Sequence, residues 1–181
     1  ALVGGREDTT LVLTRGGRIF RLGVDGWSEE LSGVALNLNA GWAGVPRSAS
    51  PTFLRAKQGV CGQVDGVCDL PSTVVGENGT YLRREKGLWK KQVIPTTKDL
   101  FAIAARFADS VYSVGETGVV LLDNGNNIDL LRDGGATLRA VAVGPKERMV
   151  AVGDQCRVLI RQKDGTFSEP EITGCKERLR A

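Results

Sequence analysis

The apolar residues of this chain fall in short runs, most of which end at a glycine, an asparagine or an aspartate. Val111-Tyr-Ser-Val-Gly115 and Met149-Val-Ala-Val-Gly153 are two such runs. Short apolar runs bounded by turn-forming residues are typical of β-strands, and no run is long enough to cross a membrane. The pattern therefore predicts an all-β chain.

The runs recur at a nearly constant spacing. The segment that begins at Leu100 matches the one that begins at Leu138, with Gly115 and Gly153 at the same place, so the period is 38 residues. A third copy places Gly76 39 residues before Gly115, and the hairpin around Gly17 supplies a fourth. Periods in the range of about 20 to 50 residues are typical of solenoids and propellers.

Each repeat contains the signals for four antiparallel strands. A Leu-x-Ala opener starts the first strand, Val-Gly-x-x-Gly forms a hairpin between the second and third, and a further turn leads to the fourth. The fourth strand carries a bulky residue that we expect in the core, namely Trp27, Trp89, Ile128 or Phe167. A meander this short must stack on its neighbours, which predicts a β-propeller of four-stranded antiparallel blades.

Residues 44–72 interrupt the period. We favour four blades with this segment as an irregular insertion, although Phe53 to Gly66 can be aligned on Tyr112 to Gly125 as a degenerate fifth blade. The whole chain, residues 1–181, is interpreted as one propeller domain or as a portion of a larger propeller. A contact between the final Leu-x-Ala, which begins at Leu179, and the first strand would close a ring. Another chain could complete the propeller instead.

Composition narrows the chemistry. The chain has no histidine, which removes the commonest general base and metal ligand, and its net charge is only +3. Four cysteines at spacings that match no recognised metal motif favour disulfides, with the pairs Cys61–Cys68 and Cys156–Cys175 expected. Disulfides would fit an oxidising compartment, so we expect an extracellular, periplasmic or cell-surface location. We expect no metal, no cofactor and no membrane insertion.

The order of these motifs resembles a known family. Leu38-Asn-Ala-Gly-Trp42-Ala and Val111-Tyr-Ser-Val-Gly115-Glu-Thr-Gly118 resemble the propeller repeats of the photosystem II assembly factor type and of related bacterial surface propellers. That family is also similar to sialidase-type Asp-box propellers. The Asp-box is degraded here to Asp164-Gly-Thr-Phe167, and the paired carboxylates of a glycosidase have no matching positions. The resemblance implies an architecture and no particular ligand.

These observations predict a non-enzymatic binding module that recognises a protein or a glycan through loops on the propeller rim, and not a nucleic acid. The carboxylates Asp109, Glu116 and Asp154 stand at turns, where acidic residues are common for backbone reasons, so an enzyme is not expected. The candidate binding residues lie near the irregular segment or on loops between first and second strands: Trp42, Phe53, Arg55, Arg106, Asp109, Lys146 and Arg148. The alternative is an assembly or scaffold factor that holds a partner protein during maturation.

Overall fold

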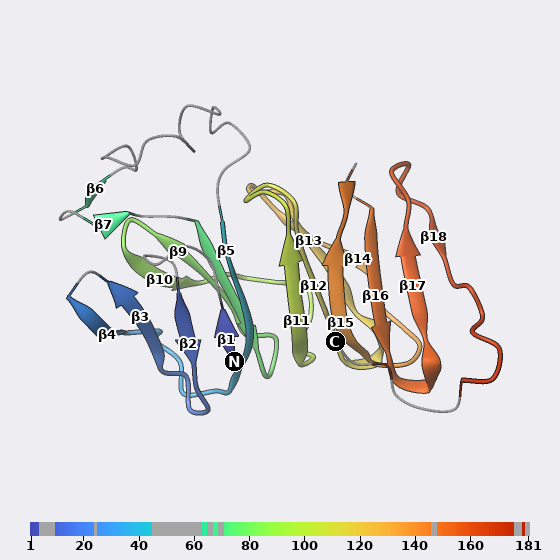
Figure 1. Cartoon of the computed structure of the whole chain (residues 1–181), viewed down its shortest axis with the longest axis horizontal. Helices are drawn as coiled ribbons and strands as arrows, with labels where there is room; N and C mark the ends of the chain where they lie inside the picture. Colours follow the sequence, from blue (N-terminus) through green and yellow to red (C-terminus); the bar gives the residue numbers. More distant parts are fainter. Residues whose placement is uncertain are drawn as a thin grey trace.

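Four antiparallel sheets of four strands each make up most of the computed structural model (Figure 1). The structure describes residues 1–3, 10–23, 25–44, 63–64, 67–68, 71–145, 148–175 and 179. In chain order we call the sheets sheet 1 to sheet 4. The predicted all-β class and the predicted four-stranded units are confirmed.

Sheets 1 and 2 contain the first half of the strands. Sheet 1 consists of β1 (Leu2–Val3), β2 (Leu11–Leu13), β3 (Ile19–Gly23) and β4 (Gly26–Glu30). Sheet 2 consists of β5 (Leu38–Ala43), β8 (Ser72–Gly76), β9 (Tyr81–Glu85) and β10 (Leu88–Lys91). A separate two-stranded sheet pairs β6 (Gln63–Val64) with β7 (Val67–Cys68).

Sheets 3 and 4 repeat the same order without an interruption. Sheet 3 consists of β11 (Leu100–Ala105), β12 (Val111–Gly115), β13 (Val120–Asp123) and β14 (Ile128–Arg132). Sheet 4 consists of β15 (Leu138–Val143), β16 (Met149–Gly153), β17 (Val158–Arg161) and β18 (Phe167–Ser168). Short 3-10 turns, Glu116–Gly118 and Asp154–Cys156, join the second strand to the third in these two sheets.

The irregular segment lies inside sheet 2. β5 pairs directly with β8, and Leu38 lies opposite Gly76 in the same register in which Leu100 lies opposite Gly115. The Gly44 amide donates a hydrogen bond of 3.1 Å to the Pro71 carbonyl, so the chain leaves and re-enters the sheet at neighbouring points. The opener of this unit is therefore Leu38, 62 residues before Leu100, and the described residues form no fifth four-stranded sheet.

Apolar clusters join consecutive sheets. One cluster combines Leu13 and Ile19 of sheet 1 with Val74 and Leu82 of sheet 2, and equivalent clusters join sheets 2 and 3 and sheets 3 and 4. We call the face that packs on the preceding sheet the leading face, and the face that packs on the following sheet the trailing face. No cluster among the described residues joins sheet 4 to sheet 1, and the sheets do not close into a ring.

The bulky fourth-strand position shows the consequence of this open arrangement. Trp89 lies on the leading face of sheet 2 and is 8% exposed, because it packs against sheet 1. Ile128 and Phe167 pack in the same way on the sheets before them. The expectation for Trp27 was wrong, since it is 52% exposed. Within the described part of the chain, no other sheet packs on the leading face of sheet 1.

The hairpin between second and third strands touches the segment that leads to the next sheet. A Cβ atom at Gly118, whose φ is +75°, would lie 2.4 Å from the Gly134 carbonyl oxygen, so only glycine fits. Cys156 occupies this position in sheet 4 and forms the predicted disulfide with Cys175, which lies in the segment after β18. A covalent bond thus takes the place of a close backbone contact.

Candidate binding surface on the loop rim

The connections of each antiparallel meander lie alternately at its two ends. Loops between first and second strands share one end with turns between third and fourth strands, and we call this end the loop rim. It includes Gly44 and Pro71, where the chain leaves and re-enters sheet 2, and also the loop at 106–110 and the turn at 124–127. The opposite end, with the 3-10 turns and the segments that connect sheets, is the hairpin rim.

A hollow of about 260 Å³ opens on the loop rim between sheets 2 and 3. We call it the rim hollow; its lining consists of Trp42, Pro71, Thr73, Arg83, Arg84, Ala108 and Gly125. Trp42 is the penultimate residue of β5, on the trailing face of sheet 2, and Ala108 belongs to the loop between β11 and β12. The hollow therefore lies where the chain re-enters sheet 2 at Pro71, beside the first loop of sheet 3.

A buried carboxylate next to the rim hollow connects sheets 2 and 3. Asp123 at the end of β13 is 1% exposed, and its two oxygens lie 2.6 and 2.7 Å from Nη2 of Arg83. The Tyr81 hydroxyl donates to Asp123 Oδ2 at 3.0 Å, and the Gly125 amide donates to Oδ1 at 2.8 Å. A charged group that is removed from water needs such partners, and they join sheet 2 to sheet 3.

Tyr81 responds to these surroundings. Its burial, and then the neighbouring negative charge of Asp123, raise the pKa of the Tyr81 hydroxyl well above its ordinary value. The hydroxyl is therefore a fixed hydrogen-bond donor and not a base. On the other side of the carboxylate, Arg83 Nη1 donates to the Gly125 carbonyl at 3.2 Å, which holds the 124–127 turn against sheet 2.

The neighbouring arginine is held by the opposite sheet. Arg84 pairs with Glu30 of sheet 1 at 3.0 Å, and Trp89 Nε1 donates to the same carboxylate at 2.7 Å. Arg21 is a second cation beside Glu30, at 3.6 Å. Both arginines of the rim hollow thus have carboxylate partners, so the hollow does not present two free positive charges to a ligand.

The structure brings together only some of the predicted binding residues. Trp42 is half-buried in the rim hollow, and Arg106 and Asp109 are exposed on the loop that contributes Ala108. Arg148 is also exposed on the loop rim, but it belongs to sheet 4 and does not line the hollow. Phe53, Arg55, Lys146 and Cys61 lie outside the described residues, as does the side chain of Cys68.

Sequence reasoning missed Thr73, Arg83 and Arg84 as lining residues. The basic residues near position 84 are visible in the sequence, but their assignment to the hollow depends on which carboxylates they meet in the neighbouring sheets. The partner of Arg83 is 40 residues away, close to one repeat period. Contacts between adjacent repeats at this distance are the signal that could have identified it.

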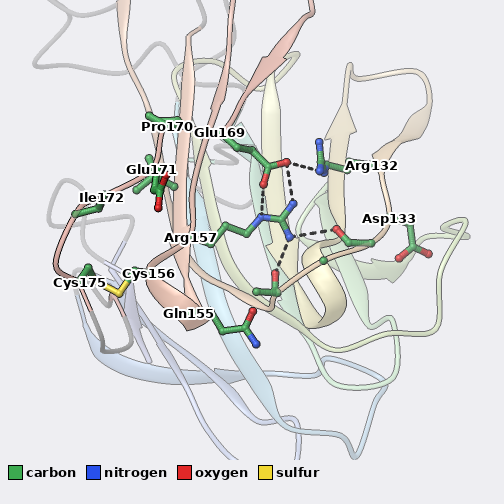
Figure 2. Close-up of a pocket in the computed structure, with 14 residues that line it drawn as sticks. Arg132, Asp133, Gln155, Cys156, Arg157, Glu169, Pro170, Glu171, Ile172 and Cys175 are labelled. Carbon is green, nitrogen blue, oxygen red and sulfur yellow. Dashed lines mark hydrogen bonds and ion pairs between the residues drawn. A yellow bond between two sulfur atoms is a disulfide. The ribbon is translucent and has the colours of Figure 1, made fainter.

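A larger hollow of about 740 Å³ lies on the hairpin rim beside the disulfide (Figure 2). Arg157 extends across it and pairs with Glu169, with Nε to Oε2 at 3.1 Å, while Arg132 contacts the same carboxylate. Nη1 of Arg157 donates to the carbonyls of Gly134 and Ala136 at 3.2 and 3.1 Å. These contacts tie the end of sheet 4 to the preceding connecting segment.

Within the described ranges, no three His, Cys, Asp or Glu side chains converge as metal ligands. The same part of the chain contains no helix with the length and apolar character needed to span a bilayer. No protein-family model matches the chain, and no curated protein is similar to it at a significant level.

Proposed function

We propose that this chain is a non-enzymatic β-propeller-type module that binds a protein or a glycan through the loop rim between sheets 2 and 3. One observation carries the proposal, namely the convergence of Trp42, both ends of residues 44–71 and the loop at 106–110 around the rim hollow. A long segment inserted at one rim of a regular scaffold is a common location for recognition, because the scaffold beneath it stays rigid.

The chemistry of the surface supports recognition over catalysis. Trp42 supplies an aromatic surface, whereas Arg106 and Asp109 supply exposed charges of both signs. Aromatic residues and arginines contribute strongly to binding energy at protein interfaces, and aromatic faces also accommodate sugar rings. The buried Arg83, Asp123 and Tyr81 group holds the position of the hollow and uses its polar atoms internally.

The Cys156–Cys175 disulfide supports a location in an oxidising compartment, such as the cell surface, the periplasm or the extracellular space. A propeller in that location would present its loop rim to soluble or surface-attached ligands. The resemblance to assembly-factor propellers supports a second candidate, a scaffold that holds a maturing partner protein through the same rim.

Direct binding measurements test the proposal. The purified chain is applied to a glycan array and to a panel of extracellular proteins, and each hit is measured again by surface plasmon resonance with W42A and R106A. We expect both variants to bind the same ligand more weakly. W42A should raise the dissociation constant by about 30-fold or more, as a central aromatic contact does. R15A is the matched control, because Arg15 is an exposed arginine on the hairpin rim.

A second variant tests the role of the irregular segment. Because Gly44 and Pro71 are hydrogen-bonded to each other, a short glycine turn can replace residues 45–70 without separating β5 from β8. Loss of the ligand with an unchanged circular dichroism spectrum would support recognition through the loop rim. Full binding by this variant and by W42A, or equal loss in R15A, would contradict it.

A further inference from the structure

The two ends of the row of sheets carry apolar faces that every internal sheet buries. On the trailing face, one cross-strand pair of the second and third strands is equivalent in all four sheets: Leu13 with Ile19, Val75 with Tyr81, Val114 with Val120, and Val152 with Val158. In the first three sheets both members are at most 3% exposed. In sheet 4, Val152 and Val158 are only half-buried, and the adjacent Val150 is 38% exposed.

The leading face shows the same contrast at the other end. Here the equivalent pairs are Val12 with Phe20, Val74 with Leu82, Ser113 with Leu121, and Ala151 with Leu159. In sheets 2 to 4 the preceding sheet covers these pairs. All of their apolar members are 0% exposed, namely Val74, Leu82, Leu121, Ala151 and Leu159. In sheet 1 the pair is half-buried, Trp27 is 52% exposed and Leu2 is 72% exposed.

The chain also marks where a following sheet would begin. The Leu38 amide, at the start of sheet 2, donates to the Thr14 carbonyl of sheet 1 at 3.4 Å. The Leu179 amide makes the equivalent bond of 3.0 Å to the Gly153 carbonyl of sheet 4. Leu179 therefore occupies an opener position beside the trailing face of sheet 4, and does not pair with β1 as ring closure within one chain would require.

We propose that the trailing face of sheet 4 binds the leading face of sheet 1 from a second copy of this chain. One chain contains both halves of an interface that it already forms three times between its own sheets, so a second copy supplies the complementary half at each end. Two copies joined head to tail at both ends form a ring of eight sheets, which lies within the four to eight blades typical of propellers, whereas three copies would exceed it.

The exposed apolar surface of the two end sheets would favour this association. Aliphatic side chains of sheet 4, including Val150 and Ile160, would cover Phe20 and Trp27, and burial of such surface is the main favourable term in association. A central aromatic residue such as Trp27 is the kind of side chain that dominates interface energy. The closed ring covers both faces in both copies. In the same region, Arg18, directly before β3, keeps its ion pair with Glu29 of β4.

Sedimentation velocity on the 181-residue chain, over a range of concentrations, tests this assembly. We expect a species with twice the mass of the 19.3 kDa chain. V150D and W27D should each raise the dissociation constant by about 30-fold or more, because each puts a charge into both interfaces. V93D is the matched control, since Val93 is 96% exposed in the segment between sheets 2 and 3 and should leave the dimer unchanged.

Mixing the two variants tests the head-to-tail geometry. An equimolar mixture of V150D and W27D retains one unaltered interface, so it should form a heterodimer at concentrations at which each variant alone is monomeric. Circular dichroism and thermal melting establish that the variants fold. A wild-type chain that stays monomeric at all concentrations, a dimer that neither variant weakens, or a mixture that stays monomeric would each overturn the proposal. None of these outcomes bears on ligand binding by the loop rim.

Discussion

Replacement of Asp123 by alanine is the most informative test of how the sheets are held together. The substitution removes a carboxylate that is 1% exposed and that accepts hydrogen bonds from Arg83, Tyr81 and Gly125. Its loss leaves a guanidinium, a hydroxyl and an amide without their acceptor. Removal of one partner from a buried ion pair typically costs 3–5 kcal/mol, because the other charge stays buried without compensation.

The structure refines this magnitude. The Arg83 side chain is 21% exposed, so water solvates part of its charge after the substitution, which places the ionic cost near the lower end of that range. The buried Tyr81 hydroxyl adds a penalty of about 1–3 kcal/mol when it loses its acceptor. We therefore expect D123A to lower the free energy of unfolding by about 4–6 kcal/mol in total.

Urea unfolding followed by tryptophan fluorescence measures this quantity by linear extrapolation. The D123A/R83L double variant should be less destabilised than D123A, because it also removes the cation that is left unpaired. E29A is the control, since Glu29 pairs with Arg18 on an exposed surface, and it should shift the urea midpoint far less. A loss below about 1 kcal/mol in D123A, or strictly additive effects in the cycle, would refute the reasoning.

Three further predictions concern the hairpins, the disulfide and alkaline pH. G118A should lower the free energy of unfolding, measured in urea, by more than about 1 kcal/mol, because a Cβ atom in this backbone conformation would collide with the Gly134 carbonyl oxygen. A variant as stable as wild type would contradict this close contact. Replacement of both Cys156 and Cys175 by serine should lower the free energy of unfolding by about 3 kcal/mol, because the disulfide links residues 19 positions apart. An unchanged melting temperature would argue against the disulfide. Because the folded state raises the pKa of Tyr81, its contribution to stability is complete below the ordinary tyrosine value of about 10 and declines as pH rises beyond it. Y81F should therefore lose stability less steeply than wild type in unfolding measurements above that pH, and identical slopes would count against the buried, neutral hydroxyl.

Repetition made much of the architecture accessible from sequence. The periodic glycines and Leu-x-Ala openers located strands and hairpins, because local turn geometry and alternation depend on neighbouring residues. The placement of Leu38 was harder, since its partner Gly76 lies beyond the irregular segment and no local signal reports strand pairing across such a distance. The exposure of Trp27 was missed for another reason: repeat equivalence predicts burial, but no sheet among the described residues packs on the leading face of sheet 1.

The candidate site was less accessible than the fold. Trp42 was identified because it stands beside the interruption of the period, and the structure places it in the rim hollow. The group of Asp123, Arg83 and Tyr81 was not identified, because it connects side chains of adjacent repeats whose residue types differ from one repeat to the next. The only sequence signal for such a contact is the separation of its residues by about one repeat period.

The hydrogen bond between Gly44 and Pro71 has a consequence for how this protein can change over time. The two strands that flank the inserted segment pair directly with each other, so this pairing does not depend on the number or identity of the residues in between. Insertions, deletions and substitutions there leave the pairing of β5 with β8 intact, while those in the hairpins change turns that the strands themselves need. This position can therefore diversify as the hypervariable loops of other scaffolds do, with new specificities arising on an unaltered framework.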